Sequence, residues 1–217
     1  LAIAVGGALL AGLDRLPGQM LLIAASVLTG VLLGVIGQVY QTGADAFELF
    51  VAWAALILPW TIISRHAAQW LVWLVVAETA LALYCEQVLV PIHDMPSELT
   101  WLLVGATVAV ALACREIAVQ RGVAWLAGHW TRLVLLFAVM VALFAPAAGH
   151  VIDVDSFKVG AVCVGAFVLA AVVASFAYWR LRPDFAALVI VIGLVDAFLV
   201  CVGYRVIEDG IGFDFDD

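Results

Sequence analysis

The chain has 217 residues, of which 67% are hydrophobic and only 12% are charged, and its formal net charge is −8. Its mean hydropathy of +1.20 lies far above the range of soluble domains, so water cannot be the solvent for most of its surface. The acidic balance and the absence of basic patches in the sequence also argue against a nucleic-acid partner. The expected partner is the lipid bilayer.

Long apolar runs follow one another along the whole chain, separated by short polar breaks. A helix that crosses the hydrocarbon core needs about 20 apolar residues. We therefore predict an all-α, polytopic transmembrane helical bundle of about eight spans, at 1–13, 18–41, 45–63, 67–90, 97–119, 130–148, 157–180 and 184–206. The number falls to seven if the short segment 1–13 is not a full span. Because Leu1 lies inside an apolar stretch, we expect that the natural N-terminus is missing or processed away.

The basic residues divide unequally between the two sides when the connections are placed on alternate sides. One side receives Arg15, Arg65, Arg115, Arg121, Arg132, Arg180 and Arg182, and the other only Lys158 and Arg205. The positive-inside rule makes the arginine-rich side cytoplasmic. Its only acids are Asp14, Glu116 and Asp184. The other side, with the C-terminus, is acidic and is expected to face outward.

The second predicted helix carries small residues at regular spacing. Ser26, Gly30 and Gly34 recur every four residues, which indicates close packing against another helix. A group of polar residues follows where this helix meets the next: Gln38, Tyr40, Gln41, Thr42 and Asp45. Two interpretations stand for this group. It lines a ligand pocket, or it forms an ordered hairpin in which Asp45 caps the next helix, with Glu48 completing a capping box.

Two acids lie near the centres of predicted spans, Glu78 in the fourth and Asp196 in the eighth. An aspartate at the centre of a transmembrane helix costs about 2.5–3.5 kcal/mol, so each acid must face protein or water, or be protonated. As proton- or cation-binding groups, one or both would take part in a relay that moves protons or cations across the membrane. As protonated acids they would hydrogen-bond to a neighbouring helix. Within a single domain, 1–217, they occupy corresponding places in two four-helix halves, 1–90 and 97–206.

No metal or cofactor site is predicted. The four cysteines lie far apart in or beside apolar runs, which favours packing roles, and the spacing of the histidines and outer acids matches no metal motif. The sequence has no Gly-rich phosphate loop, nucleophile elbow or HExxH motif. An enzyme is therefore the weakest interpretation, and no catalytic residue is assigned.

Two segments resemble a known family. These are GQVYQTGADAFELF at 37–50 and WAALILPWTIISR at 53–65. They are similar to a bacterial family of predicted integral membrane proteins of unknown function, domain of unknown function 2157, and the similarity is strongest from the second predicted helix through the fourth. The resemblance implies a multi-pass protein of the bacterial inner (cytoplasmic) membrane. It brings no established activity and no catalytic residues.

Two functional hypotheses follow from these features. In the first, the bundle binds or transports a small solute or ion, and Glu78 and Asp196 are its proton or cation groups. In the second, the protein is a non-catalytic scaffold or an accessory subunit of a larger membrane complex, and the same acids hydrogen-bond between helices. Its protein partners would be other membrane subunits or a second copy of the chain.

Overall fold

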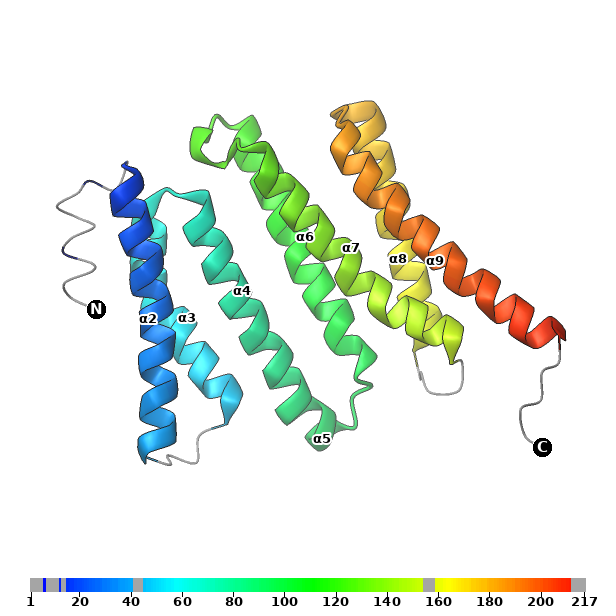
Figure 1. Cartoon of the computed structure of the whole chain (residues 1–217), viewed down its shortest axis with the longest axis horizontal. Helices are drawn as coiled ribbons and strands as arrows, with labels where there is room; N and C mark the ends of the chain where they lie inside the picture. The colour runs from blue at the N-terminus through cyan, green and yellow to red at the C-terminus, as the bar shows by residue number, and fades with distance from the viewer. Residues whose placement is uncertain (1–5, 7–11, 13–14, 41–44, 154–158, 212–217) are drawn as a thin grey trace. The chain divides into compact units, whose positions relative to one another are not determined.

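The computed structural model describes residues 6, 12, 15–40, 45–153 and 159–211, which form helices and no strand (Figure 1). The elements are α2 (Leu16–Tyr40), α3 (Ala46–Ser64), α4 (Ala67–Tyr84), η1 (Cys85–Leu89), α5 (Val90–His93), α6 (Glu98–Gln120), η2 (Ala124–Leu126), α7 (His129–Ile152), α8 (Gly160–Phe176), η3 (Ala177–Leu181) and α9 (Phe185–Ile211). Seven helical spans in this part of the chain are long and apolar enough to cross a bilayer. The predicted all-α transmembrane bundle is confirmed. The predicted segment 1–13 lies outside the described residues, except for Gly6 and Gly12.

Most helices begin and end within three residues of the predicted limits, and the larger differences lie at the polar ends. The fourth helix continues through the π-helical turn η1 and through α5 to His93, α7 ends at Ile152 instead of 148, and α9 ends at Ile211 instead of 206. Hydropathy detects the apolar centre of a span, whereas the backbone hydrogen bonds of a helix continue into the polar interface. The predicted limits therefore underestimate these helices.

The helices form two compact units. Unit 1 comprises Leu1–Asp94 and Ala118–Thr131, and unit 2 comprises Met95–Ile117 and Arg132–Asp217. In unit 1, α2 and α4 both pack against α3, and α2 also contacts α4. In unit 2, α8 packs against α9, and Gly105 of α6 lies against Leu143 of α7.

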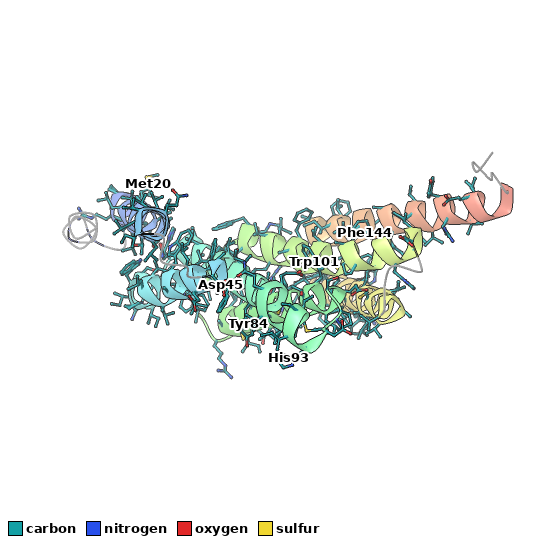
Figure 2. All side chains as sticks on the ribbon, turned by 90° about the horizontal axis from the view of Figure 1, so that it is seen from below. Met20, Asp45, Tyr84, His93, Trp101 and Phe144 are labelled. Carbon is teal, nitrogen blue, oxygen red and sulfur yellow. The ribbon has the colours of Figure 1, made fainter. Side chains whose placement is uncertain are left out.

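The outer surface of the helices is apolar, while polar side chains are found inside. Large exposed apolar side chains include Met20 of α2, which points away from its helix at the edge of Figure 2, and Trp101 of α6; they are 68% and 47% exposed. Ser26, Gln69 and Arg115 are buried. Soluble proteins bury such polar groups far less readily than apolar ones. This distribution fits helices that are surrounded by lipid and satisfy their polar groups against one another.

Candidate functional site

A buried hydrogen-bond network joins the three helices of unit 1. Its centre is the Ser26 hydroxyl of α2, which accepts hydrogen bonds from Trp60 Nε1 of α3 at 2.8 Å and from Gln69 Nε2 of α4 at 2.7 Å. Gln69 Nε2 also donates to Thr61 Oγ1 at 3.0 Å. Trp53 Nε1 donates to the backbone oxygen of Ser26 at 2.8 Å. We call these five residues the Ser26 network.

The Ser26 network satisfies most of its own polar atoms. The Ser26 hydroxyl donates to Leu22 O and the Thr61 hydroxyl to Ile57 O, each one turn earlier in the same helix. The exception is Gln69 Oε1, which is buried and has no hydrogen-bond partner among the described residues. Since a buried polar group in lipid is costly unless it is paired, the network ties α2, α3 and α4 into one arrangement.

The predicted small-residue stripe on α2 meets α3 at one of its glycines. A Cβ placed on Gly30 would lie 2.4 Å from Cζ2 of Trp53, so only glycine fits beneath this indole. A Cβ on Gly34 would have nothing within 4 Å. Thus Ser26 and Gly30 lie in the contact between α2 and α3, whereas Gly34 lies beside open space.

The predicted polar group between the second and third helices is described only in part. Gln41, Thr42 and the side chain of Tyr40 lie outside the described residues, and Gln38 is exposed on α2. Asp45 occupies the N-cap position of α3, but its side chain makes no capping hydrogen bond. The amide of Phe47, in the first turn of α3, donates instead to Gln87 Oε1 at 3.2 Å. A side chain distant in sequence therefore satisfies one of the unpaired amides at this helix start.

Unit 2 contains a cluster of charges that the sequence analysis did not predict. Glu116 of α6 pairs with Arg115 at 2.5 Å, with Arg132 of α7 at 2.9 Å and with Arg182, which follows η3. Arg132 also pairs with Asp184 at 2.8 Å. We call these five residues the charged cluster. The only sequence signal was that Glu116 and Asp184 are acids on the side where arginines collect. The arginines with which they pair are up to 66 residues away in the sequence, as Arg182 is from Glu116.

The charged cluster fixes the ends of four helices. The Asp184 Oδ1 atom accepts a hydrogen bond from the amide of Ala187 at 3.1 Å, so this carboxylate caps α9 while its other oxygen holds Arg132 of α7. The guanidinium carbon of Arg132 lies 5.6 Å from the ring centre of Tyr178, within cation–π range. Tyr178 belongs to η3, a π-helical turn of the kind that often marks functional positions.

Asp196 is exposed on α9, in a groove formed with the end of α8 and with η3. It is the twelfth of 24 residues in the span Phe185–Glu208. The groove has a volume of about 640 Å³, and its walls are mostly apolar: Phe176, Trp179, Phe185, Leu188, Val189 and Ile192. At 1.5 Å per residue, Asp196 lies about 16 Å along the helix from Phe185, close to mid-span. We call this feature the Asp196 groove.

The second intramembrane acid, Glu78, is half-buried on α4 and belongs to unit 1. The structure therefore describes Glu78 and Asp196 in separate units. Among the described residues, no group of three or more His, Cys, Asp or Glu side chains is arranged to hold a metal ion. His66, between α3 and α4, is half-buried, and this desolvation lowers the pKa of its imidazole.

Comparisons with known proteins identify a family that part of the chain resembles. No curated protein and no solved structure matches the chain. A family model described as a predicted membrane protein, DUF2157, matches residues 1–70. This stretch includes both segments that carry the resemblance, and all five residues of the Ser26 network. The resemblance is thereby confirmed: over residues 1–70 the chain matches DUF2157, a family of predicted membrane proteins.

Proposed function

We propose that the protein is a non-catalytic accessory subunit or scaffold of the bacterial inner membrane, which binds a transmembrane helix of another membrane subunit in the Asp196 groove. One observation carries the proposal. An ionisable side chain lies at mid-span on the outer surface of α9, among apolar walls. The partner helix would carry a lysine or arginine at the matching depth.

The energetic reason is the cost of leaving Asp196 against lipid. An unpartnered aspartate at the centre of a span costs about 2.5–3.5 kcal/mol. A cationic side chain on a helix in the groove would neutralise the carboxylate, and the apolar walls would pack against the rest of that helix. Contact of Asp196 with lipid is therefore unfavourable, whereas pairing with a cationic helix would make binding selective for that partner.

Transport of a solute or ion through Glu78 and Asp196 remains the other hypothesis. It requires a water-lined path to at least one of these acids. The walls of the Asp196 groove are mostly apolar, which favours a helix over a hydrated ion as the occupant. With the arginine-rich connections in the cytoplasm, as the positive-inside rule predicts, the groove would extend from the cytoplasmic surface to the middle of the bilayer.

The proposal is tested with the full chain in lipid vesicles and two synthetic transmembrane peptides, one leucine-rich with a central lysine and one with leucine there. Binding is measured by energy transfer between labelled peptide and labelled protein. We expect the lysine peptide to bind about 3- to 20-fold more tightly, the range found for polar contacts between membrane helices. Asp196→Leu should abolish this preference.

The matched control is Val200→Leu, at an exposed position of α9 outside the groove walls. It should leave the preference for the lysine peptide unchanged. An equal preference in the parent and in Asp196→Leu would refute the proposal. Self-association of the chain that excludes both peptides would also refute it, because the occupant would then be a second copy.

A further inference from the structure

A second hollow lies in unit 2, between α6 and α8 over the surface of α7. Its volume is about 270 Å³. Alanines are the commonest residues on its sides, with Ala109 and Ala113 on α6 and Ala170 and Ala174 on α8, while Leu136 and Met140 of α7 form its floor. Small side chains on both flanking helices leave this space, and we call it the alanine cavity. Its size approaches the lower limit of about 300 Å³ for ligand pockets.

The alanine cavity reaches the charged cluster at one end. Glu116 and Tyr178 are its lining residues nearest the arginine-rich ends of the helices, and Glu116 is the acid that three arginines share. The cluster holds three arginines against two acids, so it carries an excess positive charge. Its arginines differ in access, because the Arg115 side chain is 4% exposed and that of Arg182 is 25% exposed. Arg182 is therefore the one best placed to meet a ligand from outside.

We propose that the alanine cavity binds one acyl chain of an anionic phospholipid, whose phosphate group contacts Arg182. Apolar walls at membrane depth match a hydrocarbon chain and exclude a hydrated ion. A guanidinium at the helix ends matches a phosphate, which it can bind through two parallel hydrogen bonds. A basic site between transmembrane helices beside the cytoplasmic surface is a known arrangement for anionic headgroups.

The two halves of the site explain why the occupant is a phospholipid rather than a smaller molecule. A free phosphate would use Arg182 and leave the alanine cavity without apolar contacts. A neutral lipid would fill the cavity and leave the excess positive charge unmatched. Only a molecule with both parts uses both features. This inference is independent of the Asp196 groove, which lies on a different surface of α8 and shares no lining residue with the cavity.

The test uses the full chain, stripped of lipid in a neutral detergent, and native mass spectrometry to count bound lipid. Phosphatidylglycerol and phosphatidylcholine with the same acyl chains are compared. We expect phosphatidylglycerol to bind about fivefold more tightly, as for one arginine near an anionic headgroup. Ala113→Phe should fill the cavity and weaken phosphatidylglycerol binding at least as much. Arg182→Gln should instead remove the difference between the two lipids.

The matched control is Ala106→Phe, an exposed position of the same helix that does not line the cavity, and it should change neither affinity. Equal binding of the two lipids by the parent would overturn the proposal. Equal effects of Ala113→Phe and Ala106→Phe would do the same. So would complete displacement of phosphatidylglycerol by inorganic phosphate, because the site would then recognise the headgroup alone.

Discussion

The Ser26 network gives the sharpest test of what holds unit 1 together. In Ser26→Ala, two donors lose their acceptor, Trp60 Nε1 at 2.8 Å and Gln69 Nε2 at 2.7 Å. Hydrogen bonds between membrane helices contribute about 0.6 kcal/mol on average and up to about 1.7 kcal/mol. Loss of both should therefore lower the free energy of unfolding by about 1–3 kcal/mol. The upper end is reached if Trp60 Nε1 stays unpaired, because Gln69 Nε2 keeps its bond to Thr61 Oγ1.

A double-mutant cycle with Gln69→Leu separates this contact from other effects of the two substitutions. Unfolding is followed by circular dichroism during titration of the detergent-solubilised protein with sodium dodecyl sulfate. We expect a coupling energy of about 0.6–1.7 kcal/mol between the two positions, because each substitution removes the same bond. The reasoning would be refuted if the two single effects simply added.

A control on the same helix is Thr29→Val. Thr29 is buried like Ser26, but among the described residues its hydroxyl donates only to Ala25 O of its own helix, at 2.8 Å. Removing a hydroxyl whose bond is local should cost less than Ser26→Ala and should show no coupling to Gln69→Leu. Equal costs for the two hydroxyls would mean that contact between helices is not the source of the stability.

Three further predictions concern single positions, each measured as a shift in the unfolding midpoint. Gly30→Ala should destabilise the protein by about 1–3 kcal/mol, because the new Cβ would meet the Trp53 ring. Gly34→Ala should stabilise it by up to about 1 kcal/mol, because its Cβ would meet nothing and alanine favours the helix. Similar effects at both glycines would contradict the close contact of Gly30 with Trp53. Glu116→Gln should cost about 3–5 kcal/mol, since three arginines lose their shared carboxylate; a neutral result would show that the charged cluster does not stabilise unit 2. Burial lowers the pKa of His66 below 6.5, so the stability that its neutral imidazole contributes is complete above pH 6.5 and is lost as the pH falls through the lowered pKa. His66→Gln should therefore reduce the dependence of the thermal midpoint on pH between about pH 7.5 and pH 5. An unchanged dependence on pH would contradict this.

The helices of this protein were predictable because one simple signal marks them. Each span is an apolar run bounded by polar or helix-breaking residues, and lipid leaves the backbone few alternatives to a helix. Pro59 and Pro146 did not interrupt the prediction, and both lie inside helices, α3 and α7. The helix ends were harder to predict, because the chain remains helical beyond the apolar run, as at His93.

The pairing of side chains between helices was not predictable from one sequence. Ser26 and Gln69 are 43 residues apart, and nothing in their spacing shows that they face each other. Glu116 and Asp184 were recognisable as acids on the arginine-rich side, but not as partners of Arg132. The orientation of Asp196 was hidden for the same reason, because an apolar span has no polar face to indicate which side points inward.

The bonding of the Ser26 network also bears on how the first helices are inserted. The hydroxyls of Ser26 and Thr61 donate within their own helices, so α2 and α3 can each enter lipid without an unpaired hydroxyl donor. Among the described residues, the side-chain amide of Gln69 donates to Ser26 of α2 and to Thr61 of α3, and to no group of its own helix. Partition of α4 from the translocon into lipid is therefore favoured once both earlier helices stand beside it, which is the order in which the ribosome delivers them.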